Sequence, residues 1–302
     1  MPDSGWNLSD STSQQLLEKL KNAGMPLGEY VEGKIYYGIK TGYNEAFVID
    51  EATKDRLIAE DQRSAEVIKP FLAGRDVKRY MPPKSDKYLI LFPAGFTYEK
   101  MQDSVQEQWE WLQENYSSIA AFLAPHANKA IKRTDKGNFW WELRACAYYE
   151  KFERPKILFQ EIATYQAFTW DDLGMYSNNK TFIIPNGNLY LLGLLNSKII
   201  WYFINQIASK LQGGALAMQT PYTFQIPVIG GDEETRLSII SHVEHILYLK
   251  QADAAADTSA LEAEIDLQVY RLYNLTYDEV LLVEPGFALS REKYEMHEAA
   301  KV

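Results

Sequence analysis

The sequence predicts an α+β fold, in which a mixed sheet with packed helices is followed by a C-terminal antiparallel helical hairpin. Short strand-like runs are interleaved with helical patterns, without regular strand–helix–strand repeats. The apolar run 189–207 is long enough for a helix that must be buried against a sheet. After Pro227 the pattern changes to two amphipathic helices separated by a short turn. Together these observations favour an α+β body with a helical appendage.

The elements of the body are predicted in chain order. Residues 11–24 fit an amphipathic helix that stops at Gly24. The segment 30–50 has short β-rich runs around a turn at 40–44. Helical periodicity returns at 51–72 and ends at Pro70. Further expected elements are a helix at about 101–123 and strands at 88–92, 157–159, 168–170 and 181–184.

The hairpin is predicted from two apolar stripes at helical spacing. Ser259 and Glu262 fit a capping box at the start of its second helix. The stripes consist of Leu237, Ile240, Val243 and Leu247, and of Leu261, Ile265, Val269 and Leu272. The sequence therefore divides into a lead-in helix (1–29), a body (30–231), a helical hairpin (232–276) and an acidic tail (277–302).

Composition and charge bound the function. The 302 residues are 46% hydrophobic and 24% charged, an ordinary globular composition. No apolar run approaches the roughly 18 residues of a membrane span, and the first residues lack a signal-peptide pattern, so we expect a cytoplasmic protein without a membrane partner. The net charge of −10 argues against nucleic acid, but residues 232–302 alone carry −9. Segments 69–87 and 129–156 are each +4, so a body that binds phosphates remains possible.

Motifs for catalysis are missing. Pro82 and Pro83 are the sequence's one Pro-Pro pair, with neither the preceding Asn or Asp nor the following aromatic ring of an amino-methyltransferase. There is no Gly-rich cofactor loop and no phosphate loop. We therefore expect no catalytic residue, no metal and no cofactor in this chain. A self-contained nuclease using Glu32 and Lys34 is the less favoured alternative.

Three other side chains receive plain interpretations. His242 and His245 are three residues apart on a predicted helix and could face one metal, but a solvated helix face is favoured because no third ligand is suggested. Cys146 is the one cysteine, so it has no partner for a disulfide, and it is interpreted as a small buried hydrophobe.

Basic residues gather in two places. Gly74 permits a tight turn, after which Arg75, Lys78 and Arg79 emerge together and suit phosphates. A structural network of Arg75 with Asp76 or another carboxylate is weighed evenly with that function. In the second region, tryptophans 140 and 141 are expected to point inward, with Lys132, Arg133 and Lys136 outward.

Candidate contacts can be listed by chemistry. Cations suit phosphates, whereas amides and a lysine on loops suit base edges. The phosphate-binding candidates are Lys40, Lys69, Arg75, Lys78, Arg79, Lys132, Arg133 and Arg144. The base-reading candidates are Gln166, Asn178, Asn179, Lys180, Gln212 and Gln219.

Seven ordered segments carry a family resemblance. They are 38–50, 69–80, 140–144, 154–157, 191–198, 225–227 and 265–276, and their sequence resembles the TaqI-like C-terminal specificity domain. Such domains follow an adenine-N6 methyltransferase domain in type II and fused type IIG restriction-modification proteins. The resemblance implies that the body grips double-stranded DNA and reads its major groove. It also implies that the parent enzyme uses S-adenosylmethionine, and that the hairpin packs against a methyltransferase, nuclease or helicase-like partner or spaces two recognition units.

The sequence departs from the family pattern in two respects. Ala73 stands where family members usually carry a basic or polar residue, which removes one plausible phosphate contact. The methyltransferase half is missing, so an excised domain and a separate recognition subunit are both open. A further alternative is a scaffold within a phage-defence complex, in which the hairpin at 235–273 carries the important surface. The acidic C-terminal segment favours this alternative, because it would repel DNA and suit a basic protein partner.

Overall fold

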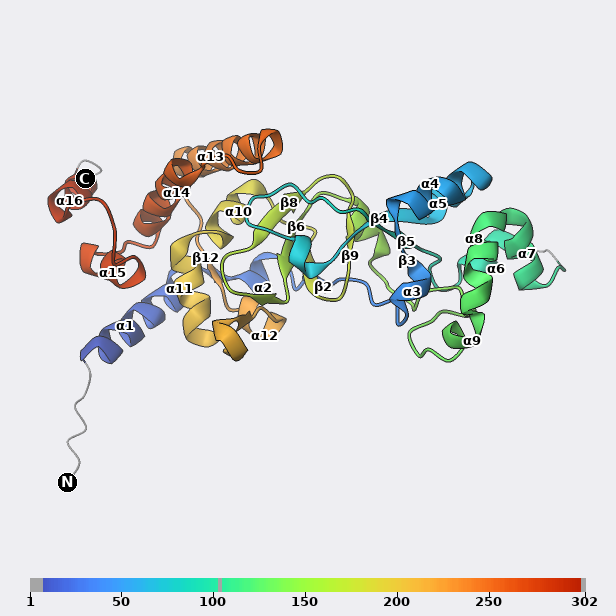
Figure 1. The fold of residues 1–302 in the computed structure, drawn as a ribbon. Helices are drawn as coiled ribbons and strands as arrows, with labels where there is room; N and C mark the ends of the chain where they lie inside the picture. The colour runs from blue at the N-terminus through green and yellow to red at the C-terminus, as the bar shows by residue number, and fades with distance from the viewer. Residues whose placement is uncertain (1–7, 103–104, 300–302) are drawn as a thin grey trace, which may run out of the picture.

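The computed structural model describes residues 8–102 and 105–299 and confirms the α+β class (Figure 1). Two four-stranded sheets occupy the middle of an elongated molecule, and helices cover both ends (Figure 1). The first sheet has the order β2 (Tyr36–Tyr37), β10 (Thr181–Ile184), β6 (Lys156–Gln160) and β8 (Phe168–Asp171), all antiparallel. The second has the order β3 (Val48–Asp50), β5 (Lys87–Ile90), β4 (Ile68–Leu72) and β9 (Tyr176–Ser177), where only β4 and β9 are parallel.

Two short strand pairs complete the sheets. Strand β1 (Met25–Pro26) pairs with β12 (Pro227–Val228), which ties the N-terminal segment to the end of the body. Strand β7 (Ile162–Ala163) pairs with β11 (Leu216–Ala217) beyond the end of β6. Segments distant in the sequence are thus joined at both places.

Helices at one end of the molecule cover the second sheet (Figure 1). They are α3 (Asn44–Phe47), α4 (Glu51–Glu60), α5 (Ser64–Val67), α6 (Phe96–Met101), α7 (Gln108–Asn115), α8 (Ser117–Leu123) and α9 (Ala127–Ala130). Short 3₁₀ turns lie at Gly74–Asp76 (η1), Ala124–His126 (η2), Tyr149–Glu153 (η3) and Gln212–Gly214 (η4).

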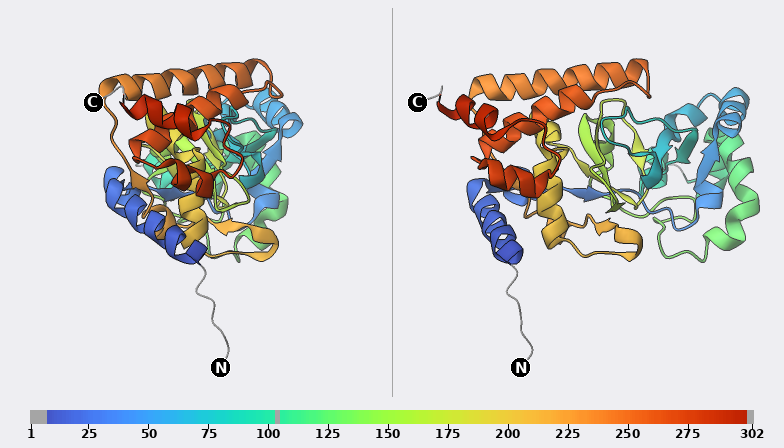
Figure 2. Two further views of the ribbon diagram at one scale, coloured as in Figure 1. Left: turned by 90° about the vertical axis from the view of Figure 1, so that its left-hand side faces the viewer. Right: turned by 60° about the vertical axis from the view of Figure 1, so that its left-hand side comes forward.

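Helices at the opposite end of the molecule pack against the first sheet and include the hairpin (Figure 2). They are α1 (Leu8–Ala23), α2 (Leu27–Tyr30), α10 (Leu189–Leu195), α11 (Lys198–Ile207), α12 (Thr220–Thr223), α13 (Glu233–Ala252), α14 (Ser259–Leu272), α15 (Tyr277–Val283) and α16 (Arg291–Ala299). None of the helices in the described residues is long and apolar enough to cross a membrane.

The first sheet separates two hydrophobic cores. Phe159 and Phe182 pack with the C-terminal helices, whereas Leu158 and Ile183 pack with the core of the second sheet. This alternation follows from the two-residue period of a strand, which sends successive side chains to opposite faces. Both faces of β6 and β10 are therefore buried, and these strands form a rigid base for the loops at their ends.

The hairpin packs closely on the body. Gly193 in α10 lies so near α13 that an added Cβ would be 2.7 Å from the Cγ2 atom of Ile239. Its buried face is continuous with the core of the first sheet, because Ile239, Val243 and Ile265 belong to the same hydrophobic cluster. The two predicted helices of the hairpin are confirmed as α13 and α14, joined by a turn at 253–258.

Three expected helices differ from the structure. The predicted helix 51–72 is wrong at its end, because residues 68–72 form strand β4. Pro70 is tolerated there because β9 pairs with β4 only from Phe71 onward. The expected helix 101–123 is divided, since α6 ends at Met101, and α7 and α8 are separated at Tyr116, whose φ of −139° and ψ of 56° are not helical.

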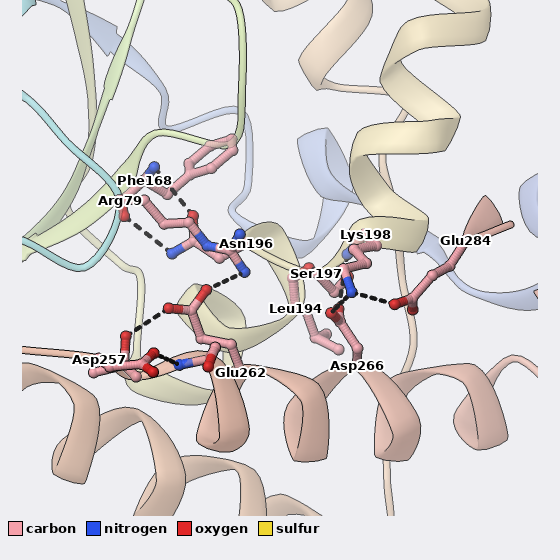
Figure 3. Close-up of polar contacts among 12 residues, drawn as sticks. Arg79, Phe168, Leu194, Asn196, Ser197, Lys198, Asp257, Glu262, Asp266 and Glu284 are labelled. Atoms are coloured by element: carbon pink, nitrogen blue, oxygen red, sulfur yellow. Dashed lines mark hydrogen bonds and ion pairs between the residues drawn. The ribbon is translucent and has the colours of Figure 1, made fainter. Parts of the chain in front are cut away.

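The expected helix 189–207 is also divided, at Asn196 and Ser197. The Asn196 side chain turns to strand β8, where it accepts from the Phe168 N–H at 3.2 Å and donates to the Phe168 carbonyl at 3.0 Å. It thus replaces a neighbouring strand at the edge of the sheet (Figure 3). The break therefore serves the sheet, which helical periodicity alone does not reveal.

The predicted capping box of α14 is wrong as well. The N-cap residue is Thr258 rather than Ser259, and its hydroxyl donates to Glu262 Oε1 at 2.6 Å. A complete capping box instead begins α15, where Thr276 and Glu279 bond reciprocally.

Candidate nucleic-acid interface

A turn at residues 178–180, between β9 and β10, lies at the centre of the candidate surface. Asn178 is fixed on both sides, because its N–H donates to the Leu72 carbonyl at 2.9 Å and its Oδ1 accepts from the Lys180 N–H at 3.1 Å. Thr181 adds a hydroxyl bond to Ser177 Oγ at 2.6 Å. The turn is therefore held in place by its contacts to buried strands.

On one side of this turn lies a hollow of about 270 Å³, the central hollow. Arg75 extends from its wall with 87% of its side chain exposed. Lys180 Nζ lies 2.9 Å from Glu161 Oε2 across it, and 59% of the lysine side chain is exposed against 16% of the glutamate. The hollow is lined by Gly74, Arg75, Gln160, Glu161, Ile162 and Lys180.

On the other side of the turn lies a second hollow of about 350 Å³. The loop 40–45 lines this hollow. Thr41 shapes the loop, because its hydroxyl accepts from the Tyr43 N–H at 3.2 Å and donates to Asn44 Oδ1 at 2.5 Å. Asn179 lines this hollow, so the turn joins the two. The lining residues are 40–45 and Asn179.

Two predicted phosphate ligands share one carboxylate beside the second hollow. Asp135 lies 3.0 Å from Lys40 Nζ and 3.5 Å from an Arg144 guanidinium nitrogen. The two cations are more than half exposed, whereas Asp135 is 15% exposed. Lys40 and Arg144 therefore remain open to solvent, where screening keeps their ion pairs with Asp135 weak.

The other exposed cations differ in their partners. Lys78 and Lys132 are exposed and form no ion pair within the described part of the chain. Lys69 is bound at 3.0 Å to Glu153, whose pKa this contact lowers. Lys69 is thus less free to bind a phosphate than its charge suggests.

Arg133 was expected to point outward, and this expectation is wrong. Its side chain is buried and stacks on Phe47, with the guanidinium 4.1 Å from the ring centroid. Its Nη1 and Nη2 atoms donate to the carbonyls of Thr41, Asp135, Trp140 and Glu142 at 2.5, 3.1, 2.7 and 2.6 Å. Five planar donors suit such a cluster of carbonyls, so Arg133 shapes the second hollow from behind.

Arg79 was also expected to bind phosphate, and in the structure its side chain is engaged with a carboxylate of the hairpin. Its guanidinium lies 2.8 Å from Glu262 Oε2 of α14, with both side chains only about one fifth exposed (Figure 3). It therefore links the body to the hairpin. A nearby network repeats this link, because Lys198 Nζ lies 2.6 Å from Glu284 and 3.6 Å from Asp266 (Figure 3). Burial raises the pKa of Asp266 to about 6.

The predicted base-reading residues separate in the structure. Gln166 is buried, so it is removed as a reader, because its side chain lies inside the fold. Gln212 and Gln219 are exposed on the segment that carries β11. Gln212 begins η4, where Gly213 and Gly214 have positive φ and open space around them. Asn178, Asn179 and Lys180 lie on the central turn, so half of the predicted readers are together.

Sequence reasoning missed Gln160, Glu161 and Ile162, which line the central hollow. Gln160 ends strand β6, Glu161 follows it and Ile162 begins β7, and a short polar pair after a buried run carries no special signal. The Glu161 carbonyl accepts from the Met218 N–H at 2.8 Å, which places the β11 segment beside the hollow.

The residues weighed for catalysis do not assemble. Glu32 and Lys34 are ion-paired with each other on an exposed turn, which lowers the pKa of Glu32. His242 Nδ1 lies 3.5 Å from the Gln268 amide nitrogen, and His245 is exposed. Within residues 8–102 and 105–299, no group of three or more His, Cys, Asp or Glu side chains could hold a metal ion.

Comparison with known proteins shows the family of this chain. Residues 69–228 match one family of specificity domains, and this stretch contains every residue that lines the central hollow. Because the match covers more than half of the chain, the chain belongs to the family of TaqI-like C-terminal specificity domains. The resemblance seen in the seven sequence segments is thereby confirmed.

Individual relatives are considerably longer. The type II methyltransferase M.BstVI of Geobacillus stearothermophilus is 22% identical over 229 residues, which cover 74% of this chain and 38% of that protein. The type IIL restriction-modification enzyme MmeI, solved in complex with DNA, is similar with a TM-score of 0.56 at 12% identity, over 87% of this chain and 35% of MmeI. The likeness to MmeI shows the fold. The chain spans little more than a third of the length of either relative.

Proposed function

We propose that this chain recognises a specific sequence in double-stranded DNA as the specificity domain of a restriction-modification system. The parent protein would be an adenine-N6 methyltransferase or a fused type IIG endonuclease-methyltransferase. The observation that carries the proposal is the family match at 69–228, because it encloses the central hollow and its exposed Arg75 and Lys180. By name, one relative described above is a type II methyltransferase and the other is a type IIL restriction-modification enzyme.

The distribution of charge supports this function despite the net charge of −10. Exposed cations line both hollows at Lys40, Arg75 and Lys180, and the exposed Arg144 shares the Asp135 carboxylate with Lys40. The net charge of −9 in residues 232–302 lies in the hairpin and the segments after it. A duplex bound at the hollows therefore meets basic side chains, whereas the acidic helices suit another partner.

Catalysis is proposed to belong to the rest of the parent protein. Neither hollow presents a nucleophile next to a base, and the side chains at the central hollow are suited to hydrogen bonding and charge pairing. We assign no cofactor to this chain, and S-adenosylmethionine to the methyltransferase part of the parent. Purified chain should therefore neither methylate nor cleave DNA on its own. Glu32→Ala should leave that result unchanged.

Salt titration of DNA binding tests the proposal. Fluorescence anisotropy with a labelled random duplex should give an affinity that falls steeply with salt, with a log–log slope of about −4 to −5 if five cations contact phosphates. Arg75→Ala should weaken binding to all sequences alike and reduce the slope by about 1. Arg56→Ala, on the exposed face of α4, is the matched control and should change neither quantity. Absence of salt-sensitive binding at micromolar protein would contradict the proposal.

A groove between α14 and α16 favours a protein partner for the helical hairpin. The groove has a volume of about 590 Å³, and Arg271 lines it. The Nε and Nη2 atoms of Arg271 are buried without a hydrogen-bond partner among the described residues. Two unpartnered nitrogens on a half-buried guanidinium favour a carboxylate from outside the chain. The full lining is Glu264, Leu267, Arg271, Leu289, Lys293 and Met296.

We therefore propose that the methyltransferase part docks in this groove and places a carboxylate against Arg271. Size-exclusion chromatography with light scattering, on the chain mixed with the separately produced methyltransferase part, should show a complex that Arg271→Glu abolishes. Arg56→Glu, at the far end of the molecule, should leave the complex intact. Point variants are preferable to deleting residues 232–302, because Ile239 and Val243 belong to the body's core. An unchanged complex in Arg271→Glu would place the contact elsewhere.

A further inference from the structure

The central hollow contains a paired donor and acceptor, of which the lysine is exposed and the glutamate is largely covered. Lys180 Nζ and Glu161 Oε2 are 2.9 Å apart, and the lysine is the more exposed partner. More than half of the lysine side chain is in water, which screens its charge and weakens the pair. Lys180 is therefore available for exchange with other polar partners, and the largely covered Glu161 carboxylate then needs a new donor.

The backbone beneath this pair is fixed. The Glu161 N–H donates to the Lys180 carbonyl at 2.9 Å, so the two residues are neighbours across β6 and β10. Gly74 closes the floor, since an added Cβ would lie 2.8 Å from the Lys180 carbonyl. The donor and the acceptor thus stand at a set spacing on a rigid sheet edge, which is what a specific contact requires.

The amides near the hollow are already engaged. Gln160 Nε2 donates to the Val77 carbonyl at 2.7 Å, and Asn178 Oδ1 accepts from the Lys180 N–H at 3.1 Å. Asparagine and glutamine are the usual partners of adenine, so these two are poorly placed to read it. The charged groups that line the hollow are those of Lys180 and Glu161, which pair with each other, and of the exposed Arg75, whose Nε atom lies 3.9 Å from Asp76.

The two exchangeable groups match one kind of base pair. In the major groove a G·C pair presents two adjacent acceptors, guanine N7 and O6, followed by the cytosine N4 donor. Lysine is suited to the guanine acceptors, and a glutamate accepts from cytosine N4. An A·T pair instead alternates acceptor, donor and acceptor and adds a methyl group, so it satisfies the pair less well.

We infer that the central hollow reads one G·C base pair, with Lys180 donating to guanine and Glu161 accepting from cytosine. Their mutual ion pair opens when DNA binds, and each group gains a base partner. Arg75, on the wall of the same hollow, holds the adjacent phosphate. This inference rests on the proposed function, because it presupposes that the duplex lies across this surface.

Selection of binding sites from a pool of random duplexes tests the inference with the full chain. The wild-type consensus should contain a position fixed as G·C, and replacing it by A·T should weaken binding by about 10-fold to 100-fold. Lys180→Gln and Glu161→Gln should each relax that position alone. The double exchange of Glu161→Lys with Lys180→Glu should favour the reversed pair, C·G.

A second ion pair supplies the matched control. Arg56 and Glu60 on α4 are 3.2 Å apart, and neither residue lines the central hollow. Arg56→Gln and Glu60→Gln should leave the consensus unchanged. Lys180 is largely exposed, so its variant tests the inference even if Glu161→Gln impairs folding, which thermal melting would detect.

The possible failures are distinguishable. If the wild-type chain selects a sequence, and the Lys180, Glu161 and exchanged variants select the same sequence at every position, the inference is overturned while the proposed function stands. If the wild-type chain enriches no sequence from the pool, the proposed function fails, and the inference fails with it.

Discussion

Replacing Arg133 by methionine should destabilise the fold rather than weaken phosphate contacts. The guanidinium donates to four backbone carbonyls and stacks on Phe47, and its side chain is only 7% exposed. Burial lowers the pKa of Arg133 to about 10, so it remains charged at neutral pH. Methionine approximates the length of the chain but leaves the four carbonyls without their donors.

The magnitude follows from these contacts. A hydrogen bond to a charged group contributes about 1.5–3 kcal/mol, but four bonds of one side chain are not additive. Removing one partner of a buried charged network typically costs about 3–5 kcal/mol. For a chain of this size each kcal/mol corresponds to a shift of about 2–4 °C, so we expect the midpoint of thermal unfolding to fall by about 10 °C.

Lys132 provides the comparison, because it is adjacent in sequence and exposed. Lys132→Met should leave the midpoint within about 2 °C, since exposed substitutions usually change stability by less than 0.5 kcal/mol. Its affinity for DNA should fall, because a phosphate contact is lost. Differential scanning calorimetry and fluorescence anisotropy measure the two properties on the same samples.

The opposite pattern would refute the argument. An Arg133→Met variant with an unchanged midpoint and a reduced salt dependence of DNA binding would identify Arg133 as a phosphate ligand. Arg133→Lys sharpens the test, because lysine keeps the charge but has three donors instead of a planar fork. If only the charge of Arg133 contributed to stability, the Arg133→Lys variant would be as stable as the wild type.

Three further predictions concern stability and the central hollow. Because the pKa of Asp266 is raised to about 6 in the folded state, folding takes up protons between its unfolded value near 3.8 and 6. The free energy of unfolding, from urea titrations, should gain about 1.4 kcal/mol from this group on going from pH 7.5 to pH 5, a gain absent in Asp266→Asn. Arg79→Ala leaves Glu262 without its ion-pair partner, so it should lower the free energy of unfolding by about 1–2 kcal/mol in the same titration. Its affinity for DNA should not fall. A loss of affinity with unchanged stability would instead identify Arg79 as a phosphate ligand. Gly74→Ala should cost about 1–3 kcal/mol, because its Cβ meets the Lys180 carbonyl, and wild-type stability would show that the turn adapts.

The fold class was predictable because periodicity reports burial. Strand β6 and the hairpin were found because their apolar residues repeat at the periods of a strand and a helix. Strand β4 was missed because its residues continue the apolar spacing of α4, and only pairing with β5 and β9 makes them extended. The break at Asn196 was missed for the same reason, since its partner Phe168 is 28 residues away. A local sequence pattern carries no information about contacts between residues so far apart in the chain.

The candidate site was predictable in part. Arg75 and Lys180 were found by chemistry alone, and the structure brings both to the central hollow. Counting charges by segment overestimated the exposed basic surface, because Arg133 and Lys156 are both buried. Lys156 is ion-paired with Asp171 between β6 and β8, where neither side chain is exposed. A sequence gives the charge of a residue but not the face on which it lies.

The segment 74–80 connects the proposed reading surface to the hairpin. It begins at Gly74 and Arg75 in the central hollow and continues to Arg79, which is ion-paired with α14. Its end is fixed as well, since the Tyr80 N–H donates to the Phe168 carbonyl at 3.0 Å and the Tyr80 ring is buried. Because only a few residues separate two fixed ends, the segment holds Arg75 at the central hollow and Arg79 on α14 at a set spacing. The same short stretch of chain therefore positions one cation for DNA and commits the next to the hairpin, a division of roles that charge counting along the sequence does not reveal.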